Sequence, residues 1–238
     1  PLLPKGFQIA VLEGAPPFTD PKSFAFLLKF PKDYVVPPHT HAVAERVTVL
    51  KGTLNLGEGD KVDKTKTKAF ETGSVLVAPA GGKHFAWTKE EVIIHVQGVG
   101  PFGITYVDPK DDPRQPPPAA EAKVEGSTDS STAPVMMGPK DIKFADAPPI
   151  LPKGAQIAVI EGTPPFADKK SYVFRLKFPD GYKIPSHFHN STERVIVISG
   201  TLEFGAGDKW DDKAMAAFTA GAVGHIPKGG NHFVRAKG

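Results

Sequence analysis

The chain has 238 residues, no cysteine and a formal net charge of +3 at pH 7. The lack of cysteine excludes disulfides, thiolate metal ligands and a cysteine nucleophile. The small, scattered charge argues against nucleic acid or an anionic membrane as a partner, and no apolar run approaches the ~18–20 residues of a membrane-spanning helix. With 24 glycines and 25 prolines, the composition favours many short strands joined by turns.

The sequence contains an internal repeat with an offset of 148 positions (151 − 3). Residues 3–18 read LPKGFQIAVLEGAPPF, and residues 151–166 read LPKGAQIAVIEGTPPF. The agreement continues without a gap from about residue 2 to residue 90. The repeat therefore predicts two domains of the same fold.

Each copy reads as strands separated by turns. In the first copy, residues 8–12 and 24–30 are predicted strands. In the second copy, the apolar residues of the equivalent strand recur at every second position: Tyr172, Phe174, Leu176 and Phe178. Side chains two apart on a strand point the same way, so this face belongs to a core or to the wall of a pocket.

The most informative stretch is GYKIPSHFHNSTERVIVISG, at residues 181–200. His187, His189 and Glu193 are all odd-numbered, so they share a face if one strand continues through them. Two imidazoles and a carboxylate form most of a site for a first-row transition metal. His232, which follows a strand and a proline bend, supplies a fourth donor.

The first copy repeats these four residue types at the same spacings, 148 positions earlier (187 − 39). Six of the eight histidines of the chain therefore occupy motif positions. We predict two divalent transition metals per chain, with these ligands: His39, His41, Glu45 and His84 in the first copy, and His187, His189, Glu193 and His232 in the second. Iron, manganese, copper, zinc and nickel all accept such donors, so the sequence does not select among them.

The strands beside the ligands are expected to form the walls of a cavity in each domain. The predicted pocket residues are Phe26, Leu28, Val47 and Val49 in the first domain, and Phe174, Leu176, Val195 and Val197 in the second. Such walls suit a small, partly apolar ligand.

Other polar side chains near the motifs have alternative interpretations. His95 lies on a predicted strand and either reaches the first pocket or is a structural or interface histidine. His225 stands where the first copy has Val77, which favours a surface position. Arg46 and Arg194 follow the two glutamates and point away from the ligands by alternation, so we expect them to form ion pairs on the outer face.

The two copies differ beyond residue 90. The first continues with predicted strands at residues 91–97 and 102–107, whereas the second stops at Gly238, the counterpart of Glu90. We therefore expect the second barrel to lack its C-terminal strands in this chain, or to borrow them from another chain.

The segment between the copies has the composition of a linker. Residues 108–134 are rich in proline, alanine, serine and charged residues and show no periodicity. The predicted domains are therefore residues 1–107 and residues 135–238, joined by a linker at residues 108–134.

The motifs resemble those of the cupin superfamily, small β-barrels that bind metals. Its first motif is Gly, five residues, His-x-His, three or four residues, Glu, six residues and Gly, which the second copy matches from Gly181 to Gly200. The first copy departs only at Asp33, which replaces the opening Gly. The second motif is Gly, five residues, Pro-x-Gly, two residues, His, three residues and Asn. Both copies match it except at the Asn, which is Thr88 or Ala236.

This resemblance implies an all-β fold of two tandem jelly-roll barrels, a bicupin, paired as an internal pseudo-dimer. The run GVGPFGITYVDPKDDPR, at residues 98–114, is similar to exported bacterial cupin proteins of unassigned activity. These are similar to the cupin domain of a zinc-dependent anti-sigma factor. A periplasmic or secreted location follows from that likeness, with the cytoplasm as the alternative.

Two classes of function remain open. Three imidazoles and one carboxylate leave a six-coordinate metal with about two positions for water, O2 or a chelating substrate. This favours a metal-dependent oxidoreductase or dioxygenase acting on a small organic or sugar-like molecule. Alternatively, the protein is a non-catalytic ligand-binding or sensor cupin with a structural metal, because no acid or base is evident beside the ligands.

Overall fold

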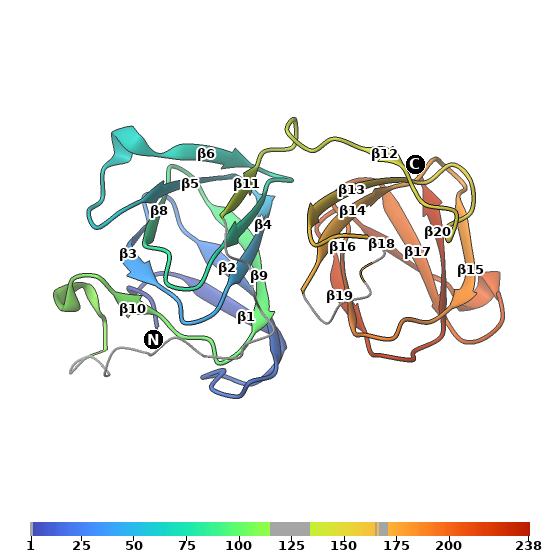
Figure 1. Cartoon of the computed structure of the whole chain (residues 1–238), viewed down its shortest axis with the longest axis horizontal. Coiled ribbons are helices and arrows are strands. Elements are labelled where there is room, and N and C mark those ends of the chain that lie inside the picture. Colours follow the sequence, from blue (N-terminus) through green and yellow to red (C-terminus); the bar gives the residue numbers. More distant parts are fainter. Residues whose placement is uncertain (1, 115–133, 165, 167–170) are drawn as a thin grey trace. The chain divides into compact units, whose positions relative to one another are not determined.

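A computed structural model describes residues 2–114, 134–164, 166 and 171–238 (Figure 1). Their contacts define two compact units. The first comprises the described residues within Pro1–Ile142 and Ile160–Val173, and the second those within Lys143–Val159 and Phe174–Gly238. Each unit is all-β, with strands that are antiparallel to their neighbours.

The first unit consists of two sheets. Its strands are β1 (Gln8–Glu13), β2 (Ser23–Phe30), β3 (Val35–Thr40), β4 (Glu45–Lys51), β5 (Thr53–Glu58), β6 (Lys68–Glu71), β7 (Val75–Ala78), β8 (His84–Thr88), β9 (Val92–Val99), β10 (Thr105–Tyr106) and β11 (Val135–Met137). The six-stranded sheet has the order β1-β2-β9-β4-β7-β11, and the five-stranded sheet has the order β10-β3-β8-β5-β6. Two short 3-10 helices, η1 (Lys64–Lys66) and η2 (Pro109–Asp111), lie in the connections.

The core of this unit lies between its two sheets. On β2, Phe24, Phe26 and Phe30 are each at most 2% exposed, as the alternation of SFAFLLKF predicts. They pack with residues of the facing sheet, such as Leu54 of β5 and Ala86 of β8, in one apolar cluster. Burying a side chain of this size contributes about 1.5–3 kcal/mol, so this cluster holds the two sheets together.

The segments around the predicted linker contribute structure to the first unit. Residues 108–114 contain η2, where the Asp108 side chain accepts a hydrogen bond from the Lys110 amide. Strand β11, which the predicted boundaries place in the second barrel, instead pairs with β7 of the first unit. The apolar run at Val135–Met137 fits this position because it completes the edge of an existing sheet. The rest of the predicted linker, residues 115–133, lies outside the described residues.

The second unit repeats part of this plan, although Ile160, Glu161 and Val173, at the ends of two of its strands, belong by their contacts to the first unit. Its strands are β12 (Ala145–Asp146), β13 (Gln156–Glu161), β14 (Val173–Lys177), β15 (Lys183–His187), β16 (Glu193–Ile196), β17 (Thr201–Ala206), β18 (Ala216–Thr219), β19 (Val223–Ile226) and β20 (His232–Lys237), with a 3-10 helix, η3 (Asp212–Ala214). The sheets are β12-β13-β14, β15-β20-β17-β18 and β16-β19. Strand β9 joins β2 to β4 in the first unit. Within the described part of the chain, no strand joins the equivalent β14 and β16, so the repeated sheet is divided.

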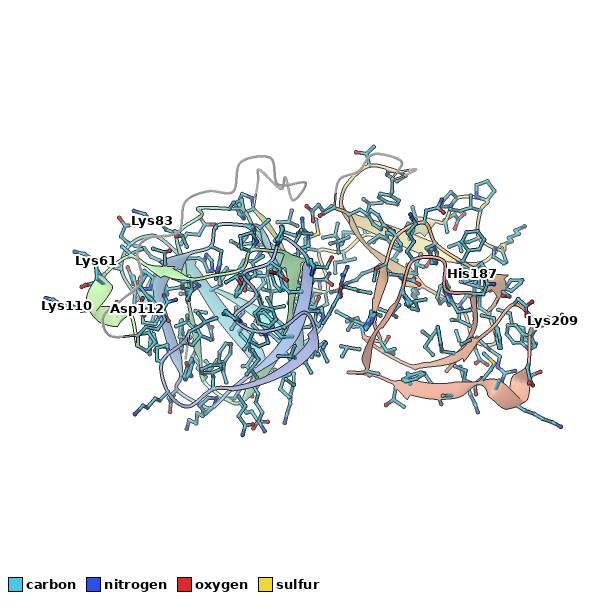
Figure 2. The ribbon with its side chains drawn as sticks, turned by 90° about the horizontal axis from the view of Figure 1, so that it is seen from below. Lys61, Lys83, Lys110, Asp112, His187 and Lys209 are labelled. Atoms are coloured by element: carbon cyan, nitrogen blue, oxygen red, sulfur yellow. The ribbon has the colours of Figure 1, made fainter. Side chains whose placement is uncertain are left out.

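The predicted fold class is confirmed: the chain is all-β and has two jelly-roll units, although their sheets do not close into barrels. The side chains of Lys61, Lys83 and Lys110 project outward from the first unit (Figure 2). No helix among the described residues is long and apolar enough to cross a membrane. The pairing of the two barrels as a pseudo-dimer stays a prediction.

Candidate metal centre

The four predicted donors of the first unit come from both sheets. His39 of β3 and His84 of β8 are register partners in the five-stranded sheet. Strand β3 ends at Thr40, so His41 lies in the following turn, and Glu45 begins β4 in the other sheet. The condition that one strand continues through the whole motif is therefore not met. A turn between two sheets brings these donors together.

These donors are close enough to bind one ion. The three imidazoles each offer a nitrogen within 4.8 Å of the other two. Glu45 Oε2 lies 3.5 Å from His41 Nε2 and 3.8 Å from His84 Nε2. Neighbouring donors that each sit about 2.0–2.2 Å from one ion lie roughly 3–3.5 Å apart, so the carboxylate is already near binding distance and the rings must close in by about an ångström or less.

Backbone carbonyls set the orientation of all three rings. His39 Nδ1 donates to the Pro37 carbonyl at 2.7 Å, His84 Nδ1 to the Gly82 carbonyl at 3.1 Å, and His41 Nδ1 to the Gly103 carbonyl at 2.5 Å. A carbonyl oxygen only accepts, so each Nδ1 carries the proton and each Nε2 keeps its lone pair. This is the arrangement that holds metal-binding histidines in place in proteins.

Burial favours the metal-binding form of these rings. It lowers the pKa of His41 and His84 to about 4 and, with His84 and His41 nearby, lowers the pKa of His39 well below its usual value. Burial also raises the pKa of Glu45. Neutral imidazoles are the form that coordinates metals, and His41 Nε2 is buried without a hydrogen-bond partner. The residues present therefore fit a divalent transition metal.

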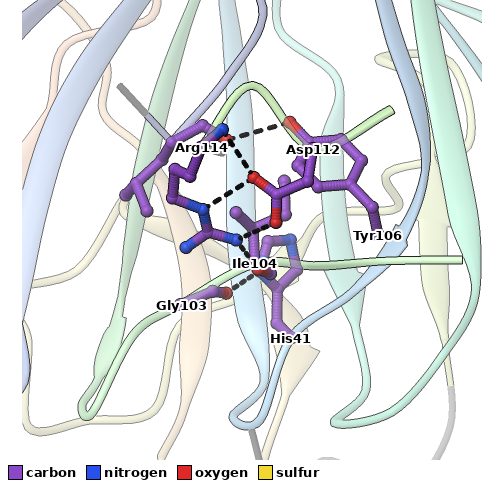
Figure 3. Close-up of polar contacts among 7 residues, drawn as sticks. His41, Gly103, Ile104, Tyr106, Asp112 and Arg114 are labelled. Atoms are coloured by element: carbon purple, nitrogen blue, oxygen red, sulfur yellow. Dashed lines mark hydrogen bonds and ion pairs between the residues drawn. The ribbon is translucent and has the colours of Figure 1, made fainter. Parts of the chain in front are cut away.

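A segment that follows β9 supports His41. Phe102 stacks on the His41 ring at 4.8 Å between centroids, and the next residue, Gly103, supplies the carbonyl that binds Nδ1. Arg114 donates to the Ile104 carbonyl at 2.7 Å and to both carboxylate oxygens of the buried Asp112. Figure 3 shows this chain of contacts, which leads from Asp112 to the metal site. The sequence offered no signal for it because backbone carbonyls leave no residue pattern.

The first site lies in a cavity of about 540 Å³. Besides the four donors, its lining consists of aliphatic, aromatic and proline side chains. Of the predicted pocket residues, Phe26, Leu28 and Val47 line this cavity, whereas Val49 packs in the core and does not. Leu2 also lines the cavity, and no sequence pattern predicts this, because the N-terminal segment comes close to the metal ligands only in the folded chain.

The second unit brings together the equivalent residues. His187 and His232 are register partners, and Glu193 Oε2 lies 3.4 Å from His189 Nε2 and 3.3 Å from His232 Nε2. Carbonyls of Pro185 and Gly230 accept from Nδ1 of His187 and His232 at 2.9 and 3.0 Å. His189 Nε2 and Glu193 Oε2 are buried without a hydrogen-bond partner, so this donor set also fits a metal.

The second site is more open than the first. The side chain of His189 is 39% exposed and that of Glu193 is 30% exposed, against 4% for His41 and 12% for Glu45. Burial lowers the pKa of His187. Of the pocket residues predicted here, Val197 is buried, and three are half-buried: Phe174, Leu176 and Val195.

The remaining polar residues lie outside both sites. His95 is buried on β9 and does not line the cavity, and His225 is exposed on β19. Arg46 forms a two-point ion pair with Glu161 of the same compact unit, at 2.6 and 2.7 Å. Arg194 lies on β16, opposite His225.

Comparison with known protein families covers nearly the whole chain. Residues 18–165 and 166–238 match the model described as "Domain of unknown function (DUF4437)". The chain belongs to the DUF4437 family. No curated protein sequence matches it significantly.

Solved structures similar to this DUF4437 chain are cupin proteins. A cupin 2 conserved barrel domain protein from Leptotrichia buccalis shares 13% identity over 98% of this chain and 84% of its own, with a TM-score of 0.53. Oxalate decarboxylase from Lactobacillus farciminis shares 14% identity over 99% and 79%, with a TM-score of 0.60. Procruciferin, an 11S globulin from Brassica napus, shares 13% identity over 99% and 78%, with a TM-score of 0.62. These likenesses confirm the bicupin fold.

Proposed function

We propose that this DUF4437 protein is a metal-dependent enzyme, an oxidoreductase or dioxygenase that acts on a small organic molecule. The observation that carries this proposal is the convergence of three imidazole nitrogens and one carboxylate in a cavity large enough for a substrate. Cavities of about 300–1,000 Å³ hold small ligands in proteins.

The residues of the first site have separate roles in this proposal. When bound, a redox-active metal would supply the means to activate O2 or a chelated substrate. His39, His41, Glu45 and His84 would hold it, and backbone carbonyls fix the three histidine rings. The apolar walls place few polar groups around the metal, and electrostatic interactions are stronger in such a low-dielectric environment.

Metal reconstitution tests this proposal. The chain is loaded separately with iron, manganese, copper and zinc, its metal content is measured, and O2 consumption is followed with a panel of small organic substrates. We expect O2 uptake only with a redox-active metal, its loss in His84→Ala, and its retention in His225→Ala, since His225 is exposed outside both sites. Absence of turnover with every metal would refute an enzymatic function.

A non-catalytic ligand-binding or sensor function is the second candidate. It is favoured by the lining of the first cavity, where the only ionisable side chains are the four donors themselves. A purified protein that holds zinc alone and binds a small molecule without converting it would support this candidate over the enzyme.

The likeness to an oxalate decarboxylase raises oxalate as a possible substrate. Oxalate carries two negative charges, and a buried charge needs a paired or coordinating partner. No lysine or arginine is among the residues that line the first cavity. The site therefore offers oxalate no charge partner other than the proposed metal.

Location and assembly are also proposals. The likeness of residues 98–114 to exported bacterial proteins supports a periplasmic or secreted location, which cell fractionation tests. Pairing of the two barrels about an internal two-fold axis is tested by small-angle scattering, and separate, unpaired units would contradict it.

A further inference from the structure

We infer that the first cavity takes an apolar molecule with a single small oxygen-chelating head group, and disfavours sugars and other hydroxyl-rich molecules. This inference rests on the proposed metal at the His39, His41, Glu45 and His84 site. It goes further by assigning the chemical class of the ligand from the rest of the cavity.

The cavity offers polar partners only at the metal site. All of its other lining residues are aliphatic, aromatic or proline, and they come from both sheets as well as from the N-terminal segment. A hydroxyl-rich ligand would leave its polar groups unpaired against these walls, which costs free energy for each group. A ligand with an apolar body gives up few hydrogen bonds to water on entering the cavity. The transfer of its apolar surface out of water is favourable.

The apolar lining extends to the solvent. Ile9, Pro16 and Pro17 line the cavity and are exposed, so the cavity opens beside them. Lysines of this unit project outward (Figure 2), and Lys83 pairs with Asp60 at 2.8 Å. No lysine or arginine lines the cavity, so none attracts an anionic group to its walls. The head group therefore binds at the donors while the apolar body extends toward Ile9.

Unbranched hydroxamic acids from two to eight carbons test this inference, because their head group chelates metals and only the apolar chain varies. Binding to the zinc-loaded 238-residue chain is measured by calorimetry in the His187→Ala variant, which leaves only the first site intact. We expect the dissociation constant to fall about fourfold for each added methylene, and glucose to bind much more weakly than the eight-carbon acid.

The His39→Ala variant is the matched control, since it leaves only the second site. The dependence on chain length should be lost in this variant. A dissociation constant that stays unchanged along the series in His187→Ala, with zinc still bound, would overturn the apolar ligand class and leave the proposed metal site standing. Absence of zinc binding to the unmutated chain would refute the metal site itself.

A pair of substitutions on β1 tests the position of the apolar body. Ile9 is 45% exposed and lines the cavity, whereas Val11 is 42% exposed on the same strand and does not line it. Ile9→Asn should weaken binding of the eight-carbon acid severalfold and leave the two-carbon acid unchanged, and Val11→Asn should alter neither. Equal effects of the two substitutions would overturn this placement. Thermal melting verifies that both variants fold.

Discussion

At the scale of single residues, the protonation of the histidines decides what the two sites can do. In the first site the Nδ1 atom of each histidine donates a hydrogen bond to a backbone carbonyl. Burial keeps the rings neutral by lowering their pKa. The second site repeats this arrangement for His187 and His232. Residue type and spacing predicted these donors, because a ligand set must be encoded in the side chains themselves.

The loss of one ligand tests the second site. In His187→Ala, we expect metal content to fall from two ions per chain to about one. The second unit should lose stability, because binding of a metal adds to the free energy of folding. Elemental analysis after gel filtration measures the first effect and urea unfolding measures the second. His225→Ala, which alters an exposed histidine of the same unit, should keep both ions. An unchanged metal content in His187→Ala would show that His187 is not a ligand.

Buried Tyr34 makes the stability of the first unit sensitive to alkali. Its hydroxyl donates to the Pro4 carbonyl at 2.5 Å, and burial raises its pKa to about 12. An unfolded tyrosine ionises near pH 10, so only the unfolded chain loses this proton as the pH rises from about 10 to 12. Stability from this group is therefore complete below pH 10 and is lost between about pH 10 and 12.

Substitution of Tyr34 by Phe isolates this effect. We expect Tyr34→Phe to cost about 1 kcal/mol below pH 10, through the lost hydrogen bond. Above pH 10, its stability should fall less steeply than that of the unmutated chain. Urea unfolding at pH 8, 10 and 11 measures both. If the two proteins lose stability in parallel from pH 10 to 11, the ionisation of Tyr34 is not responsible.

At the scale of elements, short connections rather than strands complete the first site. The turn after β3 carries His41, and the segment after β9 holds its ring in place through Gly103. Arg114 and Asp112 in turn fix that segment. Composition predicts a linker at residues 108–114, but it does not reveal that the buried Asp112 pairs with Arg114.

Removal of the Arg114 side chain tests this support. In Arg114→Ala, the affinity of the first site for metal should fall about tenfold or more, as happens when a hydrogen-bonding partner of a ligand is disturbed. The second site should keep its affinity, and competition with a chelator measures both. Lys110→Ala, which alters an exposed residue of η2, is the control. Equal affinities in Arg114→Ala and the unmutated chain would show that Gly103 is positioned without Arg114.

Both units place a glycine opposite a buried phenylalanine on the neighbouring strand. Gly57 pairs with Phe85 between β5 and β8, and Gly205 pairs with Phe233 between β17 and β20. A Cβ atom at Gly57 would lie 2.2 Å from the Phe85 ring, and one at Gly205 would lie 2.3 Å from the Phe233 ring. Glycine leaves the space that each buried ring occupies.

Gly205→Ala should therefore destabilise the second unit by about 1–3 kcal/mol, since the ring must move to make room. Gly224→Ala is the matched control. A Cβ at Gly224 of β19 would meet no atom within 4 Å, so this variant should differ little from the unmutated chain. Urea unfolding measures both, and similar losses in the two variants would contradict the proposed clash.

At the scale of the whole molecule, the repeat predicts two units, but the units differ in how complete their sheets are. In the first unit β9 joins β2 and β4 into one sheet that β11 extends. In the second unit β14 and β16 belong to separate sheets. The unit with the divided sheet is also the one whose ligands His189 and Glu193 are more exposed to solvent. The first site, in the unit with the continuous sheet, lies in an apolar cavity.

The sequence by itself determined the strand-rich fold, the duplication and the four donor residues of each copy. These features depend on the order of residues along the chain: on side-chain alternation, on fixed spacings and on the repeated motif. Only the tertiary structure showed that His41 and Glu45 approach each other across a turn, that β11 joins the first unit, and that Gly103 orients His41. It also decided that the remaining walls of the first cavity are apolar. Those walls come from segments far apart along the chain, so no local pattern could reveal which side chains meet there.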